Sequence, residues 1–166
     1  FETLCHSISL LIECGLKDFE WRVAGISNSD LIVKVVRKKL KSLFPKINLV
    51  LLGKLPEQDL IRNLLESDLY VMPSHIENSP NNLCEAMILG MPCIATFAGG
   101  TGSLLEDKNE GILIQDGDPW VMAGAIFECY KDKETYIKYG ANARIRALKR
   151  HDKKKIVNDL LDVYSD

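Results

Sequence analysis

Short apolar runs that favour β-strands alternate with helical segments along residues 1–114, and this alternation limits the fold more than any other feature. The strand candidates are rich in aliphatic and β-branched residues and are bounded by turn residues. They lack the strict apolar–polar alternation of half-exposed strands, as expected for parallel strands that are buried on both faces. The candidates lie at residues 20–26, 47–53, 68–74, 92–98 and 111–114.

Helical periodicity fills the segments between the strands. Residues 1–14 carry apolar side chains at three- and four-residue spacing, and Gly15 ends that pattern. Further helices are expected at 29–43, 56–67, 118–131, 133–150 and 152–164. In the helix at 29–43, the side chains expected to face the core are Leu31, Val35, Val36, Leu40 and Leu43.

This order of elements predicts an α/β fold: a doubly wound, Rossmann-like parallel sheet with helices on both faces. The chain opens on a helix, without the strand that a right-handed crossover places before it. It also starts at Phe1 instead of methionine. We therefore expect residues 1–166 to form a single domain that is a fragment of a longer polypeptide.

Composition argues against several classes of protein. The chain is 46% hydrophobic and 27% charged, which fits a soluble globular domain. Its net charge of -2 provides no basic field for nucleic acid. The five cysteines form no Cys-x-x-Cys pair, so a reducing, cytoplasmic location is favoured over a disulfide framework or a zinc site. No apolar run approaches the roughly 20 residues that span a bilayer.

Two carboxylates, Glu77 and Glu85, flank an expected helix start in the stretch SHIENSPNNLCEAMILG. Glu77 follows the third strand candidate, so it lies at the rim where ligands of open parallel sheets bind. The helix is expected to start between Ser79 and Asn82, with Ser79 or Asn81 as its N-cap. The first backbone N–H groups of this helix then form an anion site that suits a phosphate.

This layout matches the parts of a nucleotide-sugar. A diphosphate would lie on the amides near Asn81, Asn82 and Leu83, a ribose diol on Glu85, and a sugar on Glu77. Carboxylates suit vicinal hydroxyls because each oxygen accepts a separate charge-assisted hydrogen bond. Spacing alone is weak evidence, since a glutamate early in a helix is often only a partner of the helix dipole.

The residues around the two glutamates resemble the signature of a known enzyme family. The stretch VMPSHIENSPNNLCEAMILGMPCIATFAGG contains Pro-Ser, a Glu-x7-Glu pair, Glu-Ala-Met, Gly-x-Pro and Gly-Gly in that order. This pattern resembles that of the retaining nucleotide-sugar glycosyltransferases with the GT-B fold, of the family-4 or glycosyl transferases group 1 type. The flanking segments VLLGKLPEQDLIRNLLESDLYV and EGILIQDGDPWVMAGAI are also similar, so the resemblance covers essentially the whole chain.

The resemblance implies a role for each site residue. Glu77 would be the catalytic-site residue on the donor sugar, together with Asn78 and Ser79; Asn81, Asn82 and Leu83 would hold the diphosphate, Glu85 the ribose, and Gly53 and Lys54 would lie beside the nucleobase. The family works without a metal or a cofactor other than its donor substrate, here a UDP-, GDP- or ADP-sugar.

The departures from the family pattern indicate one half of a GT-B enzyme. The family's Arg and Lys-Gly pair would precede Phe1, and its glutamate three residues beyond Gly-Gly is Ser103 here. The resemblance thus implies a C-terminal donor-binding domain that is inactive alone. The whole enzyme would pass a sugar, with retention, to a glycan or glycolipid held by its N-terminal domain. Such transfer would serve cell-envelope polysaccharide or glycolipid synthesis, including capsule and lipopolysaccharide. The resemblance also allows peripheral contact of the whole enzyme with the inner face of the membrane.

Two other interpretations stay open. One is a GT-B relative with different chemistry, such as a sugar-nucleotide epimerase; the other is a non-catalytic module that binds nucleotide-sugars. His75, next to the end of the third strand candidate, has the chemistry of an acid or base. Its position favours a structural hydrogen bond instead.

Overall fold

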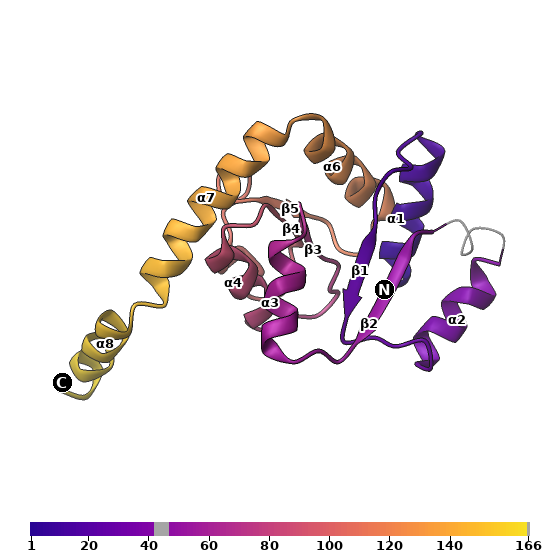
Figure 1. Ribbon diagram of the computed structural model, residues 1–166. Coiled ribbons are helices and arrows are strands. Elements are labelled where there is room, and N and C mark those ends of the chain that lie inside the picture. Colours follow the sequence, from indigo (N-terminus) through magenta and orange to yellow (C-terminus); the bar gives the residue numbers. More distant parts are fainter. Residues whose placement is uncertain (42–46, 166) are drawn as a thin grey trace.

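The computed structural model describes residues 1–41 and 47–165. Every strand pair within them is parallel (Figure 1). The strands are β1 (Trp21–Ala24), β2 (Leu49–Gly53), β3 (Tyr70–Met72), β4 (Cys93–Thr96) and β5 (Ile112–Ile114). The helices are α1 (Glu2–Glu13), α2 (Leu31–Lys39), α3 (Glu57–Leu65), α4 (Asn81–Leu89), α5 (Thr101–Leu104), α6 (Pro119–Lys131), α7 (Lys133–Arg150) and α8 (Lys153–Ser165).

The predicted α/β fold and the order of its elements are confirmed, with element ends that differ by a few residues. Asp118 caps α6 as expected, since its carboxylate accepts hydrogen bonds from the amides of Trp120 at 2.9 Å and Val121 at 3.0 Å. Only α5, a single turn after the Gly-Gly pair, was not expected. The part of the chain at 42–46 lies outside the described residues, and so does the predicted core position Leu43.

The sheet differs from the prediction because it is divided. β1 pairs with β2, and β3, β4 and β5 form a second sheet in that order. A groove of about 790 Å³ is lined by both β1 and β3. All four residues of β4, which has a partner on each side, are buried, whereas Tyr70 and Val71 of β3 are only half-buried. Among residues 1–41 and 47–165, the division therefore leaves one edge of β1 and one edge of β3 without a neighbouring strand.

Helices cover the sheets through two apolar clusters. One cluster joins α1 to α6 through side chains such as Ile8 and Met122. The other joins α4 and α7 to the sheet that contains β4, with Leu83 and Ala143 fully buried. α7 lies close against the end of α4: a Cβ atom on Gly140 would lie only 2.4 Å from the carbonyl oxygen of Gly90, so glycine is needed at this contact. These contacts hold α4, which carries Glu85, on its sheet.

The core-facing side of α2 was partly mispredicted. Leu31 is 75% exposed and Val35 is 39% exposed, whereas Val33, Val36 and Leu40 are buried. The helix begins at Leu31, after Asp30, so residues at the third, sixth and tenth positions after the cap face the core. Val36 and Leu40 were correctly predicted, and the apolar Leu31 misled the choice of face.

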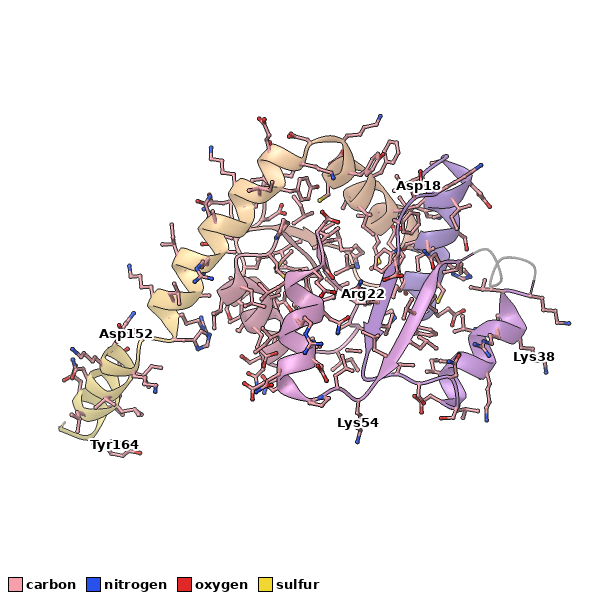
Figure 2. The ribbon with its side chains drawn as sticks, viewed as in Figure 1. Asp18, Arg22, Lys38, Lys54, Asp152 and Tyr164 are labelled. Carbon is pink, nitrogen blue, oxygen red and sulfur yellow. The ribbon has the colours of Figure 1, made fainter. Side chains whose placement is uncertain are left out.

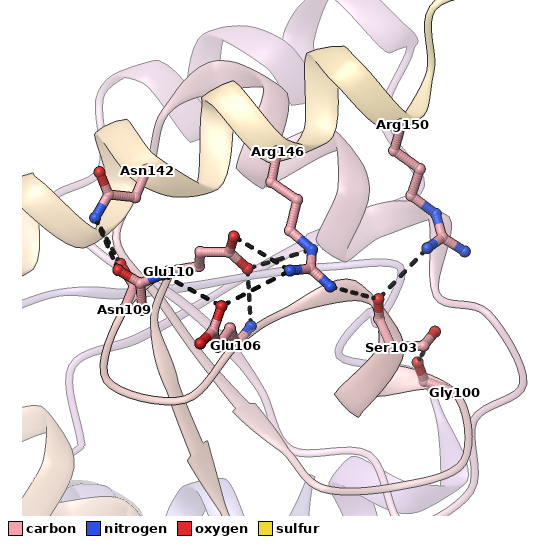
Figure 3. A network of polar contacts seen from close by, with 8 residues as sticks. All are labelled: Gly100, Ser103, Glu106, Asn109, Glu110, Asn142, Arg146 and Arg150. Carbon is pink, nitrogen blue, oxygen red and sulfur yellow. Dashed lines mark hydrogen bonds and ion pairs between the residues drawn. The ribbon is translucent and has the colours of Figure 1, made fainter. Parts of the chain in front are cut away.

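An arginine of α7 fixes the segment after α5 (Figure 3). The carboxylate of Glu110 is almost fully buried; it accepts a hydrogen bond from the amide of Glu106 at 2.9 Å and pairs with Arg146 at 3.4 Å. Arg146 also donates to the carbonyl of Ser103 at 3.1 Å. One guanidinium therefore ties α7 both to α5 and to the loop before β5.

Replacing Arg146 by methionine is expected to destabilise the domain. The change leaves the buried carboxylate of Glu110 without its cation, and breaking such a pair costs roughly 1–3 kcal/mol when one partner is still partly exposed. Urea unfolding measures the loss. Lys149→Met, on the exposed side of the same helix, is the matched control and should change the free energy of unfolding little. Equal stability of the two variants would contradict the assigned role of Arg146.

Candidate functional site

The site lies where β3 ends, at the carboxyl edge of the strands. The hydroxyl of Thr96, at the end of β4, donates to the carbonyl of Ser74 at 2.5 Å and to that of Met72 at 3.4 Å. This anchor fixes the direction in which the chain leaves the sheet. Glu77 follows in the loop before α4 and is half-buried, while Asn78 and Ser79 are exposed. All three are thus placed at the edge where ligands of parallel sheets bind.

The Gly99–Gly100 turn packs directly against the backbone of the Glu77 loop. A Cβ atom on Gly99 would lie 1.6 Å from the carbonyl oxygen of Glu77, and one on Gly100 would lie 2.1 Å from that of Asn78. The amide of Gly100 donates to the same Asn78 oxygen at 3.0 Å, and Gly99 has a φ of 52°. In the sequence, Gly99 and Gly100 were only one element of the family pattern. The structure shows why both are glycine: a side chain at either position would collide with the backbone of the Glu77 loop.

The N-terminus of α4 has no side-chain cap. The N-cap is Pro80, which has no side-chain acceptor, so the expected caps at Ser79 and Asn81 were wrong. In the described part of the chain, the amide of Leu83 is used by the Asn82 side chain at 3.0 Å, while no acceptor meets the amides of Asn81 and Asn82. Two open N–H groups at a helix start, with the positive end of its dipole, form an anion site.

Tyr70 lines the groove together with Asn82 and Glu85, and sequence reasoning did not single it out. Burial raises the pKa of its hydroxyl, and the nearby carboxylates of Glu77 and Glu85 raise it further, while the Asn82 side chain opposes the shift. The hydroxyl is therefore within electrostatic reach of both glutamates. Within an aliphatic strand, the sequence signal was the amphipathic tyrosine itself, whose buried hydroxyl needs a polar partner.

Glu85 and Asn82 face the groove between the two sheets. Both line it, together with Ser74 after β3 and with Gly25 and Ile26 after β1. Glu85 is exposed on the first turns of α4. The structure thus places the expected ribose-binding residue on the same groove as the carboxyl end of β1.

Gly53 and Lys54 lie at the same edge but farther along it. The carbonyl of Gly53 accepts from the amide of Gly25 at 2.7 Å, and its own amide donates to Ile26 at 2.9 Å. Gly53 has a φ of 65°, which turns the chain at the end of β2, and Lys54 points away from the body of the protein (Figure 2). Both are beyond β1 as seen from Glu85, and neither lines the groove.

His75 has the structural contact that its position favoured. Its Nδ1 lies 3.3 Å from the carboxylate of Asp116, and its ring packs beside Gly117. The pair connects the loop after β3 with the loop after β5. Ser103 likewise has a structural contact, because its hydroxyl donates to the carbonyl of Gly100 at 2.8 Å (Figure 3).

A family model and individual relatives both match this chain over most of its length. The sequence model described as Glycosyl transferases group 1 matches residues 15–146. The N-acetyl-alpha-D-glucosaminyl L-malate synthase of Bacillus anthracis is 32% identical over 128 residues, which are 76% of this chain and 33% of that protein. The UDP-Gal:alpha-D-GlcNAc-diphosphoundecaprenol alpha-1,3-galactosyltransferase of Escherichia coli is 31% identical over 121 residues, 73% of this chain and 30% of that protein. The chain therefore spans about a third of the length of these relatives.

A solved structure shares the fold. Anabaena Alr3699/HepE, crystallised in complex with UDP, superposes with a TM-score of 0.83 at 23% identity. The match covers 96% of this chain and 44% of that one.

Proposed function

Because this chain belongs to the glycosyl transferases group 1 family, we propose that residues 1–166 are the C-terminal donor-binding domain of a two-domain GT-B glycosyltransferase. The observation that carries the proposal is the pair Glu77 and Glu85 on either side of the open N-terminus of α4. This arrangement offers acceptors for two sets of hydroxyls with an anion site between them. A nucleoside-diphosphate sugar has those three parts in the same order.

The diphosphate would lie on the amides of Asn81 and Asn82, and the amide of Leu83 would join them once the Asn82 side chain releases it. As the bond between the anomeric carbon and the diphosphate breaks, negative charge grows on the leaving group. Donors that are fixed before the reaction stabilise such charge without reorganising. The acceptor hydroxyl would form the new bond to that carbon and pass its proton to the departing diphosphate. The resemblance supports retention of configuration at that carbon.

The glutamates would bind the two ends of the donor. Glu85 would accept hydrogen bonds from the ribose hydroxyls, and Gly53 and Lys54 would lie toward the nucleobase. Glu77 would contact the sugar with Asn78 and Ser79, which makes it the catalytic-site residue that orients the anomeric carbon. The rigid support of the Glu77 loop by Gly99 favours this role, since orientation requires a fixed backbone.

The relatives support the class of substrate. The Escherichia coli relative is named for UDP-Gal and a diphosphoundecaprenol-linked sugar, and the structural neighbour was crystallised with UDP-glucose as well as with UDP. The donor proposed here is accordingly a nucleoside-diphosphate sugar, with UDP as the first nucleotide to test. The acceptor would be a cell-envelope glycan or glycolipid on the other domain. The enzyme would then work in the cytoplasm, in peripheral contact with the membrane.

None of the helices within residues 1–41 and 47–165 is both long and apolar enough to cross a bilayer.

Calorimetry on the isolated chain tests the donor site. UDP is expected to bind weakly, and at least about tenfold more tightly than UMP, because only the diphosphate reaches both open amides of α4. GDP with GMP and ADP with AMP form matched pairs that identify the base. No sugar transfer from a UDP-sugar is expected without the second domain. Equal affinity for UDP and UMP would contradict the diphosphate site, and turnover by the isolated chain would contradict its assignment as half an enzyme.

A further inference from the structure

The imidazole ring of His75 is held in one orientation at the carboxyl edge of the strands. Its Nδ1 atom lies 3.3 Å from one carboxylate oxygen of Asp116, and the other oxygen of Asp116 accepts a hydrogen bond from the Gln115 side chain at 3.4 Å. The edge of the ring also lies close to the backbone of Gly117, since a Cβ atom there would be 3.4 Å from the Cε1 atom of His75. Both a polar contact and packing therefore fix the ring.

The two loops that meet at this pair are anchored on either side of it. After β3, the carbonyl of Ser74 accepts a hydrogen bond from the hydroxyl of Thr96 at 2.5 Å. After β5, the chain turns at Gly117, which has a φ of 72°, and the carboxylate of Asp118 then caps α6. The pair formed by His75 and Asp116 thus joins two segments whose backbones are already held in place.

One ring nitrogen of His75 remains available to a ligand. A carboxylate can only accept hydrogen bonds, so the Nδ1 atom carries the proton that is directed at Asp116. Within the described residues, the Nε2 atom has no hydrogen-bond partner, and the His75 side chain is 57% exposed. The Nε2 atom accepts a hydrogen bond in neutral imidazole and donates one in imidazolium, and a sugar hydroxyl can be the partner in either case.

The order of the strands places this pair on the side of the site that lies away from the groove. Glu85 lines the groove that β1 shares with β3, and His75 does not. The Glu77 loop rests on the Gly99 turn, which follows β4, and Asp116 follows β5. Along the carboxyl edge, Glu85 therefore comes first, the Glu77 loop second, and the contact with Asp116 last. A donor with its ribose at Glu85 and its sugar at Glu77 has the far end of the sugar toward His75.

We propose that His75 contacts the donor sugar through its Nε2 atom, at the hydroxyl on C4 or C6, which is the end of a hexose far from the anomeric carbon. Asp116 is a positioning residue, because it acts only through the orientation of the ring. Two peptide units separate His75 from Glu77, so their Cα atoms lie at most about 7 Å apart and one sugar can contact both side chains. The inference rests on the proposed function, since it requires a donor sugar at Glu77.

This contact makes His75 a residue that selects among donor sugars. Common hexoses differ from one another in the direction or presence of single hydroxyls. A site that hydrogen-bonds one hydroxyl binds an analogue without that hydroxyl less well, because the polar group of the protein loses its partner. The choice of sugar then depends on His75 and Asp116, whereas the binding of the nucleotide does not.

Calorimetry on His75→Asn separates the ligand contact from the structural one. Asparagine places an amide nitrogen where histidine has Nδ1, so it keeps the hydrogen bond to Asp116 but has no atom at the position of Nε2. UDP-glucose affinity is expected to fall by about threefold or more, with UDP affinity and the melting temperature unchanged. His75→Gln, whose longer side chain places its amide near the position of Nε2, should restore part of the loss. Full UDP-glucose affinity in His75→Asn would overturn the proposal.

A double-mutant cycle tests the role of Asp116. Asp116→Ala alone should weaken UDP-glucose binding relative to UDP binding, because the ring loses its orientation. In the His75→Asn background, the same change should have no further effect on the ratio of the two affinities. Effects of the two substitutions that add in full would contradict the assignment of Asp116 as a positioning residue.

Two further donors identify the hydroxyl. UDP-galactose is the C4 epimer of UDP-glucose, and UDP-xylose lacks the C6 hydroxymethyl group. The unaltered chain should distinguish UDP-glucose from at least one of them, and this discrimination should disappear in His75→Asn. Equal affinity of the unaltered chain for all three would overturn the proposal.

The matched control is His151→Asn, which changes an exposed histidine at the end of α7 and should alter none of these affinities. Absence of UDP binding by the unaltered chain would contradict the donor site itself, and with it the role of His75. UDP binding with a ratio of UDP-glucose to UDP affinity that no His75 or Asp116 variant changes would contradict only this inference.

Discussion

Replacing Gly99 by alanine is expected to move the Glu77 loop and to weaken binding of a nucleotide-sugar more than binding of the free nucleotide. The new Cβ atom would lie 1.6 Å from the carbonyl oxygen of Glu77, so one of the two backbones must shift. The φ of 52° adds strain of about 1 kcal/mol for a residue with a side chain. Because Glu77 is proposed to contact only the sugar, affinity for UDP should fall less than affinity for UDP-glucose.

Calorimetry with UDP-glucose and UDP, together with thermal unfolding, measures both effects. Gly124→Ala is the matched control, since a Cβ atom there meets nothing within 4 Å in the middle of α6. Alanine at that helical position should be neutral or stabilise by up to about 1 kcal/mol. If Gly99→Ala leaves both affinities and the melting temperature unchanged, Gly99 does not support the loop as described.

Replacing Glu85 by alanine is expected to weaken UDP binding by about tenfold or more, which corresponds to about 1.4 kcal/mol. A carboxylate that accepts hydrogen bonds from two ribose hydroxyls contributes roughly 1.5–3 kcal/mol for each charge-assisted bond, before desolvation of the carboxylate reduces the sum. The fold should stay intact, because Glu85 is exposed and forms no ion pair within the described residues. UDP titrations and the melting temperature separate the two effects.

Two further variants sharpen this experiment. Glu57→Ala removes an exposed glutamate from the first turn of α3, away from the groove, and should leave UDP binding unchanged. Glu77→Ala should weaken UDP-glucose binding more than UDP binding, whereas Glu85→Ala should weaken both about equally, because both ligands carry the ribose. An unchanged UDP affinity in Glu85→Ala would count against the ribose assignment.

Local sequence signals predicted the elements and the edge at which the glutamates lie. Helix ends followed capping residues such as Asp118, and strands followed apolar runs between turn residues, because these preferences act over a few neighbours. The same signals failed at α2, where an apolar Leu31 is exposed and the buried face is set by where the helix starts. They also failed at the start of α4, where the expected side-chain cap is absent and the amides are open.

The sequence by itself determined the α/β class, the order of its elements and the placement of Glu77 and Glu85 around a helix start. Only the tertiary structure decided that the sheet is divided between β1 and β3, that Gly99 supports the Glu77 loop, and that Tyr70 lines the same groove as Glu85. The first group depends on periodicity and turn chemistry within short windows. The second depends on contacts between residues far apart in the chain, and these follow from how the packed elements fill space.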